Sequence, residues 1–346
     1  MTNSLFREGG PLKTRHLGGD QYSMSIPLPA DSCGRIARHC PLADCSPGYF
    51  KINTDTVKTP DQTEAYCPYC RHVDDTQGFA TTEQLRYAED IAMKELHEDV
   101  NRMVKNAFGL GYTNKKRVGN GLISMEISYR PGSTPHVRRP FEEDLQRAVI
   151  CPHCSLDHAV FGLAVWCPNC GHDIFMTHVE AEYSVVRTIL SDVDRRRNDL
   201  GTRIAARDVE NCLEDIVSIY EAVLRALLRR SLRNRGMPEE EIETIFKNKV
   251  RNRFQDPTGS AEIIQSQLSV NLFESQDPKA IETLKLTFGK RNPITHNLGV
   301  VDRKYINTVL SAEREGRELR VVPDEITHAI DISLGILRFL HGRLFP

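Results

Sequence analysis

Four close pairs of cysteines constrain the fold of this chain more than any other feature of its sequence. Three of them are C-x2-C pairs, in which a two-residue gap lets a tight turn direct both thiolates at one tetrahedral ion. The fourth pair has four residues between its cysteines. Taken in chain order as two sets of four, the pairs predict two structural zinc ions, with the ligands Cys40, Cys45, Cys67 and Cys70 in the first set and Cys151, Cys154, Cys167 and Cys170 in the second.

The two sets differ in how closely they match a zinc ribbon. The second has the spacing C-x2-C-x12-C-x2-C, and Gly171 follows it where such a turn often needs a positive φ. The first contains the wider pair, so Cys33, His39 and His72 are alternative ligands. Four thiolates leave no open coordination position, which favours a structural ion over a catalytic one. Cys212 follows a helical apolar pattern and is expected in a core.

Composition and the ends of the chain set the broad class. The 346 residues are 40% hydrophobic with a formal net charge of -2, as in an ordinary globular protein of two or three domains. The polar, glycine-rich start has no apolar segment typical of a signal peptide, and no run of about 18 apolar residues predicts a membrane span. We therefore expect a cytoplasmic protein without a membrane partner, whose cysteines bind metal rather than form disulfides.

The residue patterns predict an α+β multidomain chain of four segments. Residues 1–78 contain a loop-rich start and the first zinc ribbon, 79–147 a helix and a small β insert, 148–177 the second zinc ribbon, and 178–346 an all-α bundle. The expected helices begin at Thr81 or Thr82 and run to about 108, then span about 179–206, 208–235, 238–254, 277–290, 293–313 and 323–344. The expected strands are 122–129, about 159–166 and 174–177.

The block Arg291-Asn292-Pro293-Ile294-Thr295-His296 carries the groups that could act on a phosphodiester. Two other arginine–histidine pairs have similar spacing, Arg130 with His136 and Arg147 with His153, but they lie in a loop and next to a zinc knuckle. Asn292 before Pro293 resembles an N-cap followed by the first helical position. His296 would then lie in the first turn of a helix, where the dipole favours the neutral imidazole. Arginine supplies a bidentate fork for phosphate oxygens.

The motif Arg291-Asn292-x3-His296, extended by Asn297, Gly299, Asp302 and Tyr305, resembles the signature of the HEPN-domain proteins. The resemblance covers about residues 180–346. It implies an all-helical bundle, metal-independent endoribonuclease activity, and a homodimer in which two motifs form one composite site. Family members often carry Glu-x3-Lys on an upstream helix. The closest match here is Glu221-x3-Arg225, with arginine in place of lysine.

The resemblance also implies a role for each residue. His296 would promote attack of the ribose 2′-OH on phosphorus or protonate the leaving 5′-oxygen, and Arg291 would stabilise the phosphoryl charge. Asn292 would position the substrate or His296. Glu221 and Arg225 would orient Arg291 or hold a phosphate. No cofactor is expected for this chemistry, and the products would be a 2′,3′-cyclic phosphate and a 5′-OH end.

A run of arginines after Glu221 predicts a surface for the RNA backbone. Arg229, Arg230 and Arg233 are the candidate contacts. The alternative interpretation is that these cations complement the dipole of a helix C-terminus and form a solvated face with the nearby acidic residues 239–241.

Three functional hypotheses follow from these patterns. The first is an endoribonuclease acting on RNA such as tRNA, in antiviral defence or a toxin system, the biological role being implied by the resemblance alone. The second is a non-catalytic sensor or adaptor, in which the zinc modules bind nucleic acid or a protein partner and the bundle dimerises. The third is a zinc-ribbon transcription or RNA-processing factor.

Overall fold

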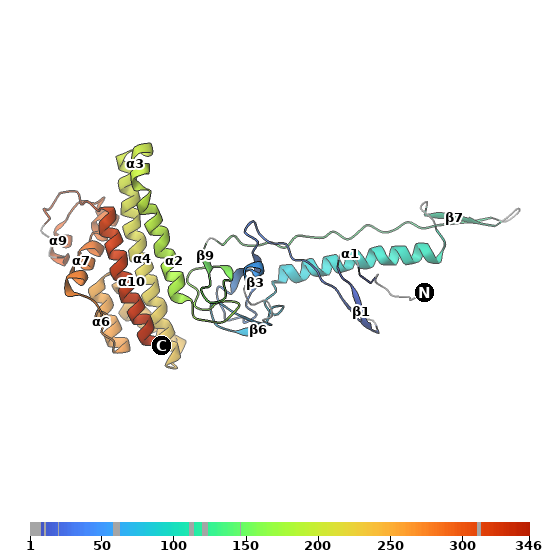
Figure 1. The fold of residues 1–346 in the computed structure, drawn as a ribbon, viewed down its shortest axis with the longest axis horizontal. Helices are drawn as coiled ribbons and strands as arrows, with labels where there is room; N and C mark the ends of the chain where they lie inside the picture. Colours follow the sequence, from blue (N-terminus) through green and yellow to red (C-terminus); the bar gives the residue numbers. More distant parts are fainter. Residues whose placement is uncertain are drawn as a thin grey trace. The chain divides into compact units, whose positions relative to one another are not determined.

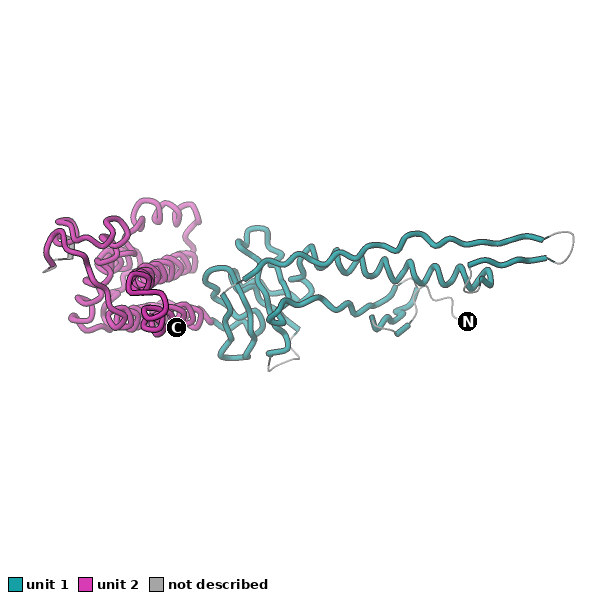
Figure 2. The backbone as a smooth tube through the Cα atoms, turned by 90° about the horizontal axis from the view of Figure 1, so that it is seen from above, with its two compact units in different colours: residues 1–173 teal, residues 174–346 magenta. Residues whose placement is uncertain are grey.

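The computed structural model describes residues 8–9, 12–19, 21–57, 63–110, 114–119, 124–145, 147–309 and 313–346. The chain divides into two compact units, residues 1–173 and 174–346, coloured separately in Figure 2. Unit 1 contains small antiparallel sheets and one long helix, and unit 2 is helical (Figure 1). Within the described ranges, no helix combines the length and the apolar composition that crossing a bilayer requires.

The described part of unit 1 consists of small antiparallel sheets and the long helix α1. Three two-stranded sheets, β1–β2, β5–β6 and β7–β8, accompany a four-stranded sheet of order β3-β4-β10-β9. The elements are β1 (Arg15–Gly18), β2 (Gln21–Ser23), β3 (Ile36–His39), β4 (Tyr49–Asn53), the 3-10 turn η1 (Thr54–Thr56), β5 (Glu64–Tyr66), β6 (Val73–Asp75), α1 (Thr82–Ala107), β7 (Lys115–Val118), β8 (Met125–Ser128), β9 (Arg147–Ile150) and β10 (Asp157–Val160).

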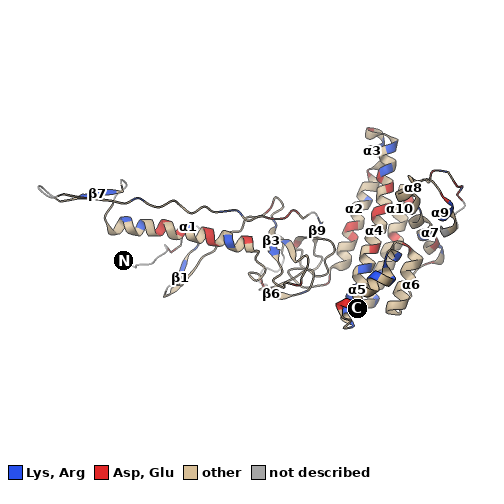
Figure 3. Ribbon diagram, turned by 180° about the vertical axis from the view of Figure 1, so that it is seen from behind, with Lys and Arg blue, Asp and Glu red and all other residues tan. Residues whose placement is uncertain are grey.

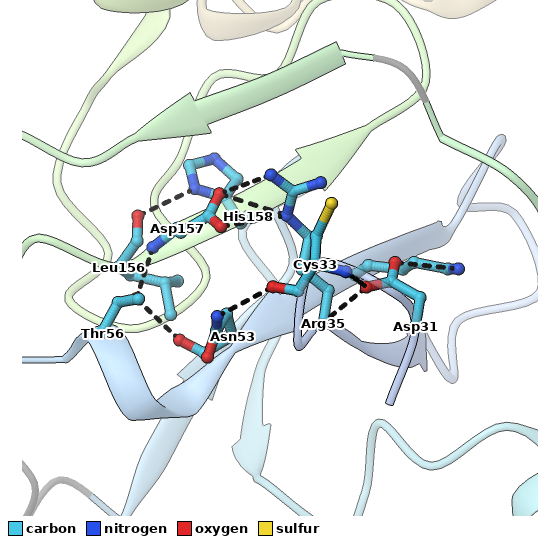
Figure 4. Close-up of polar contacts among 9 residues, drawn as sticks. Asp31, Cys33, Arg35, Asn53, Thr56, Leu156, Asp157 and His158 are labelled. Atoms are coloured by element: carbon cyan, nitrogen blue, oxygen red, sulfur yellow. Dashed lines mark hydrogen bonds and ion pairs between the residues drawn. The ribbon is translucent and has the colours of Figure 1, made fainter. Parts of the chain in front are cut away.

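The four-stranded sheet joins the two cysteine-rich segments, which the sequence predicted as separate modules. The hairpin β3–β4 belongs to the first segment and β9–β10 to the second. Their inner strands pair antiparallel, with Phe50 opposite Val160, and both side chains are buried. Arg35 also bonds Asp157 with its Nε and a terminal nitrogen, at 3.0–3.2 Å (Figure 4). The two segments therefore share one core and one hydrogen-bonded sheet.

The long helix α1 begins at Thr82, one of the two starts that the sequence left open, and Thr81 is its N-cap. Thr81 accepts a hydrogen bond from the backbone of Gln84, and the Gln84 side chain accepts one from Thr81 in return, a complete capping box. The Gln84 amide also donates to the carbonyl of Ala37 at 2.9 Å, which ties the start of α1 to β3. The strand predicted at 122–129 is observed as the shorter β8. Ile123 lies outside the described residues, and Met125 is exposed rather than half-buried.

Three long helices of unit 2 pack side by side, and shorter elements cover them (Figure 1). The three are α2 (Phe175–Ser191), α4 (Thr202–Asn234) and α10 (Pro323–Leu344), and the buried stripe of α4 includes Leu213, Tyr220 and Leu227. The remaining elements are α3 (Val193–Leu200), α5 (Glu239–Ile245), the π-helical turn η2 (Phe246–Val250), the 3-10 turn η3 (Arg253–Gln255), α6 (Pro257–Leu268), α7 (Pro278–Gly289), α8 (Arg291–Asn297) and α9 (Arg303–Val309).

Several boundaries in unit 2 differ from the predicted ones. The strand predicted at 174–177 is wrong, because Ile174 and Phe175 begin α2; a short apolar run does not distinguish a strand from a buried helix start. The helix predicted at 179–206 is divided after α2 and again at Gly201, whose φ of 95° ends α3. The sequence prediction missed α6, although Asp256 caps it directly before a proline at its first position.

Candidate functional site

The eight paired cysteines form two clusters, each within unit 1. The Cys40 cluster contains Cys40, Cys45, Cys67 and Cys70, and the Cys151 cluster contains Cys151, Cys154, Cys167 and Cys170. Within each cluster the sulfurs lie within 4.8 Å of one another, and the shortest pairs are 3.5–3.7 Å apart. A zinc–sulfur bond of about 2.3 Å places two ligands of a tetrahedron about 3.8 Å apart. Both clusters are therefore compatible with a structural zinc ion.

The structure selects among the alternative ligands of the first set. Cys33 is exposed and outside the cluster. His39 is likewise no member of it, and the His72 Nε2 lies 3.8 Å from the carboxylate of Asp74 instead. The wider pair of Cys40 and Cys45 thus completes the set with the C-x2-C pair, as the primary prediction had it.

The three C-x2-C turns share one backbone geometry. In each, the first cysteine carbonyl accepts from the amide four residues on, and its own amide donates to the carbonyl five residues on. The residue four positions after the first cysteine has a φ of 64° in all three turns, and these residues are Arg71, Ser155 and Gly171. The expected positive φ at Gly171 is therefore confirmed, and the other two turns hold ordinary side chains in the same conformation.

The turn that begins at Cys67 and the turn that begins at Cys167 bind each other through reciprocal backbone hydrogen bonds. The Tyr66 amide donates to the Pro168 carbonyl at 2.8 Å, and the Trp166 amide donates to the Pro68 carbonyl at 3.1 Å. The guanidinium of Arg71 lies 4.4 Å from the centre of the Trp166 ring, whereas Gly171, in the matching place, lies against Tyr66. These hydrogen bonds and ring contacts join the two clusters into one body.

The electrostatics of the Cys40 cluster favours a bound cation. Burial raises the pKa of Cys45 to about 12, because a thiolate there loses water and faces other sulfurs. A bound metal ion reverses this penalty, since it pairs with the thiolates directly. Cys212 is different: it is buried in α4, its pKa is also raised to about 12 by burial, and it lies in the apolar core as the sequence predicted.

The helix that carries the Arg–His motif is shorter than the sequence predicted and differently placed. It is α8, which begins at Arg291 and ends at Asn297, so Asn292 is not its N-cap. His296 lies in its last turn rather than its first, which removes the expected influence of a helix N-terminus. The two motif residues are five apart and therefore about 140° apart around a helix. His296 is exposed, and Arg291 is partly buried.

The extension of the motif shapes the chain that follows α8. Leu298 and Gly299 have φ values of 52° and 82°, so the helix ends in a left-handed turn. The Asp302 carboxylate accepts from the Tyr305 amide at 2.7 Å at the start of α9, and Tyr305 is buried with Val301. These residues fix the course of the backbone after α8.

A hydrogen-bonded network joins Arg291 to the two residues matched upstream. Arg225 donates to Glu221 at 2.8 Å on α4, and Glu221 accepts from the Gln255 amide at 2.8 Å. The Gln255 carbonyl oxygen accepts from Arg291 at 2.9 Å. Arg225 also donates to the carbonyl of Arg251. The network therefore brings together three of the predicted site residues, through a glutamine that the sequence analysis did not select.

A pocket of about 440 Å³ lies beside Arg291 in unit 2. Its lining mixes cationic, acidic, amide, hydroxyl and apolar groups, the acidic ones being Asp256 and Glu282, but His296 is not part of it. We call it the Arg291 pocket; the lining residues used below are Asn252, Gln255, Thr258, Lys285, Arg291 and Lys304. Its lysines lie on α7 and α9, and only the assembled bundle brings them to Arg291. Asp256-Pro257, a helix start after Gln255, is the one local signal that could have drawn attention to this segment.

The arginine run on α4 is occupied by acidic and aromatic neighbours. Arg229 bonds Glu239 and Glu243, and Arg233 forms a two-point pair with Glu239 at 2.8 Å. Arg230 lies over the ring of Phe345 at 3.8 Å. Figure 3 shows the acidic residues of α5 next to the basic ones at this end of unit 2. These contacts agree with the interpretation as a paired, solvated face, and RNA contact there stays a prediction.

The aromatic residues near the zinc knuckles have structural partners. The Tyr69 hydroxyl donates to the Tyr49 carbonyl at 2.8 Å and accepts from the Phe161 amide at 2.9 Å.

Comparisons with family models, with curated proteins and with solved structures find no match to this chain. The function of the chain is therefore inferred from the motif in unit 2 and the geometry around it.

Proposed function

We propose that the chain is a metal-independent endoribonuclease of the HEPN type that acts as a homodimer. One observation carries the proposal: Arg291 is linked through Gln255 to Glu221 and Arg225, the residues that the resemblance assigns to the same site. Their positions are about 70 residues apart in the sequence, so their assembly is a property of the fold. The two zinc ions stabilise unit 1 and take no part in the cleavage step.

The chemistry follows from the groups at the motif. His296 accepts the proton of the ribose 2′-OH while the 2′-oxygen forms a bond to phosphorus. The bond between phosphorus and the 5′-oxygen then breaks. The leaving 5′-oxygen takes up a proton, from the second copy of the histidine in a composite dimer site or from water. Arg291 stabilises the negative charge on the phosphoryl oxygens, and Asn292 holds the substrate. The products are a 2′,3′-cyclic phosphate and a 5′-OH end.

RNA, including tRNA, is the proposed substrate, and antiviral defence or a toxin system is the proposed setting. Arg229, Arg230 and Arg233 would contact the RNA backbone only by exchanging their present acidic and aromatic partners for phosphates. The zinc-bearing unit 1 would bind a further protein or nucleic acid that directs or restrains the enzyme.

A second candidate is a non-catalytic sensor or adaptor. The observation that favours it is that His296 is exposed and lies outside the Arg291 pocket. One copy of the chain therefore offers phosphate-binding groups without the motif histidine beside them. In this reading unit 2 binds RNA and dimerises without turnover.

A cleavage assay separates the two candidates. We expect His296→Ala to lower RNA cleavage by at least about 100-fold, because a general acid–base contributes on that scale. His328→Ala is the matched control, since His328 is an exposed histidine on α10. The assay includes EDTA for a short exposure, with circular dichroism to verify folding, and identifies 5′-OH ends. Equal cleavage by the His296→Ala and control proteins contradicts the proposed mechanism, and RNA binding without any cleavage favours the adaptor.

A further inference from the structure

Arg291 has hydrogen-bonding capacity that the described chain does not use. One terminal nitrogen donates to Gln255, but its Nε is buried and has no hydrogen-bond partner among the described residues. A buried, unpaired donor on a cation is costly, because it has lost water without gaining an acceptor. Arg291 also lines the pocket of about 440 Å³. An anionic oxygen placed in that pocket would lie beside the guanidinium of Arg291.

Gln255 keeps the charge of Arg291 available. Its amide nitrogen donates to Glu221 and its carbonyl oxygen accepts from Arg291, so the orientation of the carboxamide is set by its two partners. A neutral amide therefore stands between the carboxylate and the guanidinium, which form no direct ion pair. Because Glu221 is already paired with Arg225 and Gln255 lies between it and Arg291, Glu221 does not neutralise the Arg291 guanidinium directly.

The rest of the pocket matches the groups of a nucleotide. Lys285 and Lys304 add two further cations to its lining, so that with Arg291 three cations stand against the carboxylates of Asp256 and Glu282. Asn252 and Thr258 add amide and hydroxyl groups suited to ribose hydroxyls or base edges. Asp256, one acidic group in the lining, is occupied by the amide of Gly259 at 2.7 Å. Pockets of this volume hold ligands of the size of a mononucleotide.

We propose that the Arg291 pocket binds one nucleotide of a single-stranded RNA, with its phosphate on Arg291 and with Gln255 as the residue that positions Arg291. This inference rests on the proposed function, because it places the nucleotide next to the phosphate that is cleaved. It adds a substrate class: an unpaired RNA segment, since a base held in a duplex cannot enter a pocket. Gln255 acts through Arg291 and is therefore a positioning residue rather than a catalytic one.

The test measures binding by the full-length, zinc-loaded protein, with no cleavage needed. The probes are adenosine 3′-monophosphate and a five-nucleotide oligoadenylate whose 2′-hydroxyls are replaced by hydrogen, so that it cannot be cut. We expect Gln255→Glu to weaken oligonucleotide binding by at least about tenfold, because the new carboxylate pairs with Arg291 and competes with phosphate. Gln265→Glu is the control, an exposed glutamine on α6 with the same change of charge, and we expect less than a twofold effect.

Each outcome bears on the proposal. Equal effects of the two glutamate variants overturn it, as does a wild-type protein that binds neither probe. Tighter binding of the mononucleotide than of the oligonucleotide overturns the assignment to RNA in favour of a free nucleotide. If thermal unfolding shows that Gln255→Glu has lost its fold, Lys285→Gln replaces it, with the same expected loss of affinity. Binding that depends on Gln255 in a protein without cleavage activity overturns only the proposed enzyme, whereas cleavage without such binding overturns only the pocket.

Discussion

The cysteine clusters of unit 1 and the Arg291 network of unit 2 are assembled in different ways. In each cluster, two neighbouring cysteines are held by a short turn, so most of the ligand geometry is set within a few residues. In the network, Arg225 and Glu221 come from α4, Gln255 from a 3-10 turn and Arg291 from α8. A ligand set with local geometry can be read from spacing, whereas a network of distant residues depends on helix packing.

The two units also differ in what stabilises them. Unit 1 has short strands and hydrogen-bonded C-x2-C turns around two candidate metal sites, whereas unit 2 has a continuous apolar core along α2, α4 and α10. Metal binding and folding are coupled in small domains of the first kind, because the thiolates form no site in the unfolded chain. The following predictions test that contrast, beginning with the largest expected effect.

Removing the metal should disrupt unit 1 and spare unit 2. Structural zinc contributes about 10–16 kcal/mol of apparent binding free energy in small zinc domains. We expect two zinc ions per chain, one fewer in Cys67→Ser, and no loss in Cys212→Ser, because Cys212 lies in the core away from both clusters. Hydrogen exchange after chelation should speed up in β3, β4, β9 and β10 while the amides of α4 and α10 stay protected.

Metal analysis and exchange together make this prediction easy to contradict. A Cys67→Ser protein that keeps two zinc ions would show that another residue serves as a ligand in the Cys40 cluster. Equal loss of protection in α4 would show that the two units fold as one cooperative body rather than separately.

Gly171→Ala tests the close packing of the turn at Gly171 against Tyr66. The residue has a φ of 64°, and an added Cβ would lie 2.8 Å from the Tyr66 ring. We expect a loss of about 1–2 kcal/mol in the free energy of unfolding of unit 1, measured by denaturant with zinc present. Arg71→Gly at the matching position should change stability by less than about 1 kcal/mol, because relief of backbone strain offsets the lost contact with Trp166.

The ring contact and the backbone strain can be separated by a second substitution. In a Tyr66→Ala background, Gly171→Ala should cost only the backbone part, about 1 kcal/mol. An unchanged cost in that background would contradict the role of the Tyr66 ring.

The ion pairs of α4 with α5 should contribute least. Hydrogen bonding from Arg233 lowers the pKa of Glu239 below its ordinary value of 4.5. Because the pKa of Glu239 is lower in the folded protein, its contribution to the free energy of unfolding is complete above about pH 4.5. That contribution is lost as the pH falls through the folded pKa. We expect Glu239→Gln to cost about 0.5 kcal/mol at pH 7, because the pair is half exposed, and nothing in strong acid.

Glu241→Gln is the control for that measurement, since Glu241 is an exposed residue of the same helix. Unfolding free energies across pH 3 to 7 compare the two variants with the wild type. A Glu239→Gln cost that persists below the folded pKa would show that the side chain acts through packing rather than through its charge.

The accuracy of the sequence predictions follows the same division between local and distant interactions. The helix predicted at 323–344 is α10 to the residue, and the threonine at 81 caps α1 as expected, because a proline start and a capping box are local signals. The helix predicted at 293–313 fails, since the left-handed turn at Leu298 ends α8 and contacts with residues 316–319 direct the chain to α9. Those contacts come from sequence positions that no local pattern connects.

The sequence by itself determined the two sets of four cysteines that are compatible with zinc, and the presence of a helical second half. It could do so because thiolate spacing, caps and apolar periodicity act over one or two turns of chain. Only the tertiary structure decided that the two ribbons share a sheet, that His296 lies apart from the Arg291 pocket, and that Gln255 connects Arg291 to Glu221. Packing between distant segments sets these relations, and only the folded chain brings those segments together.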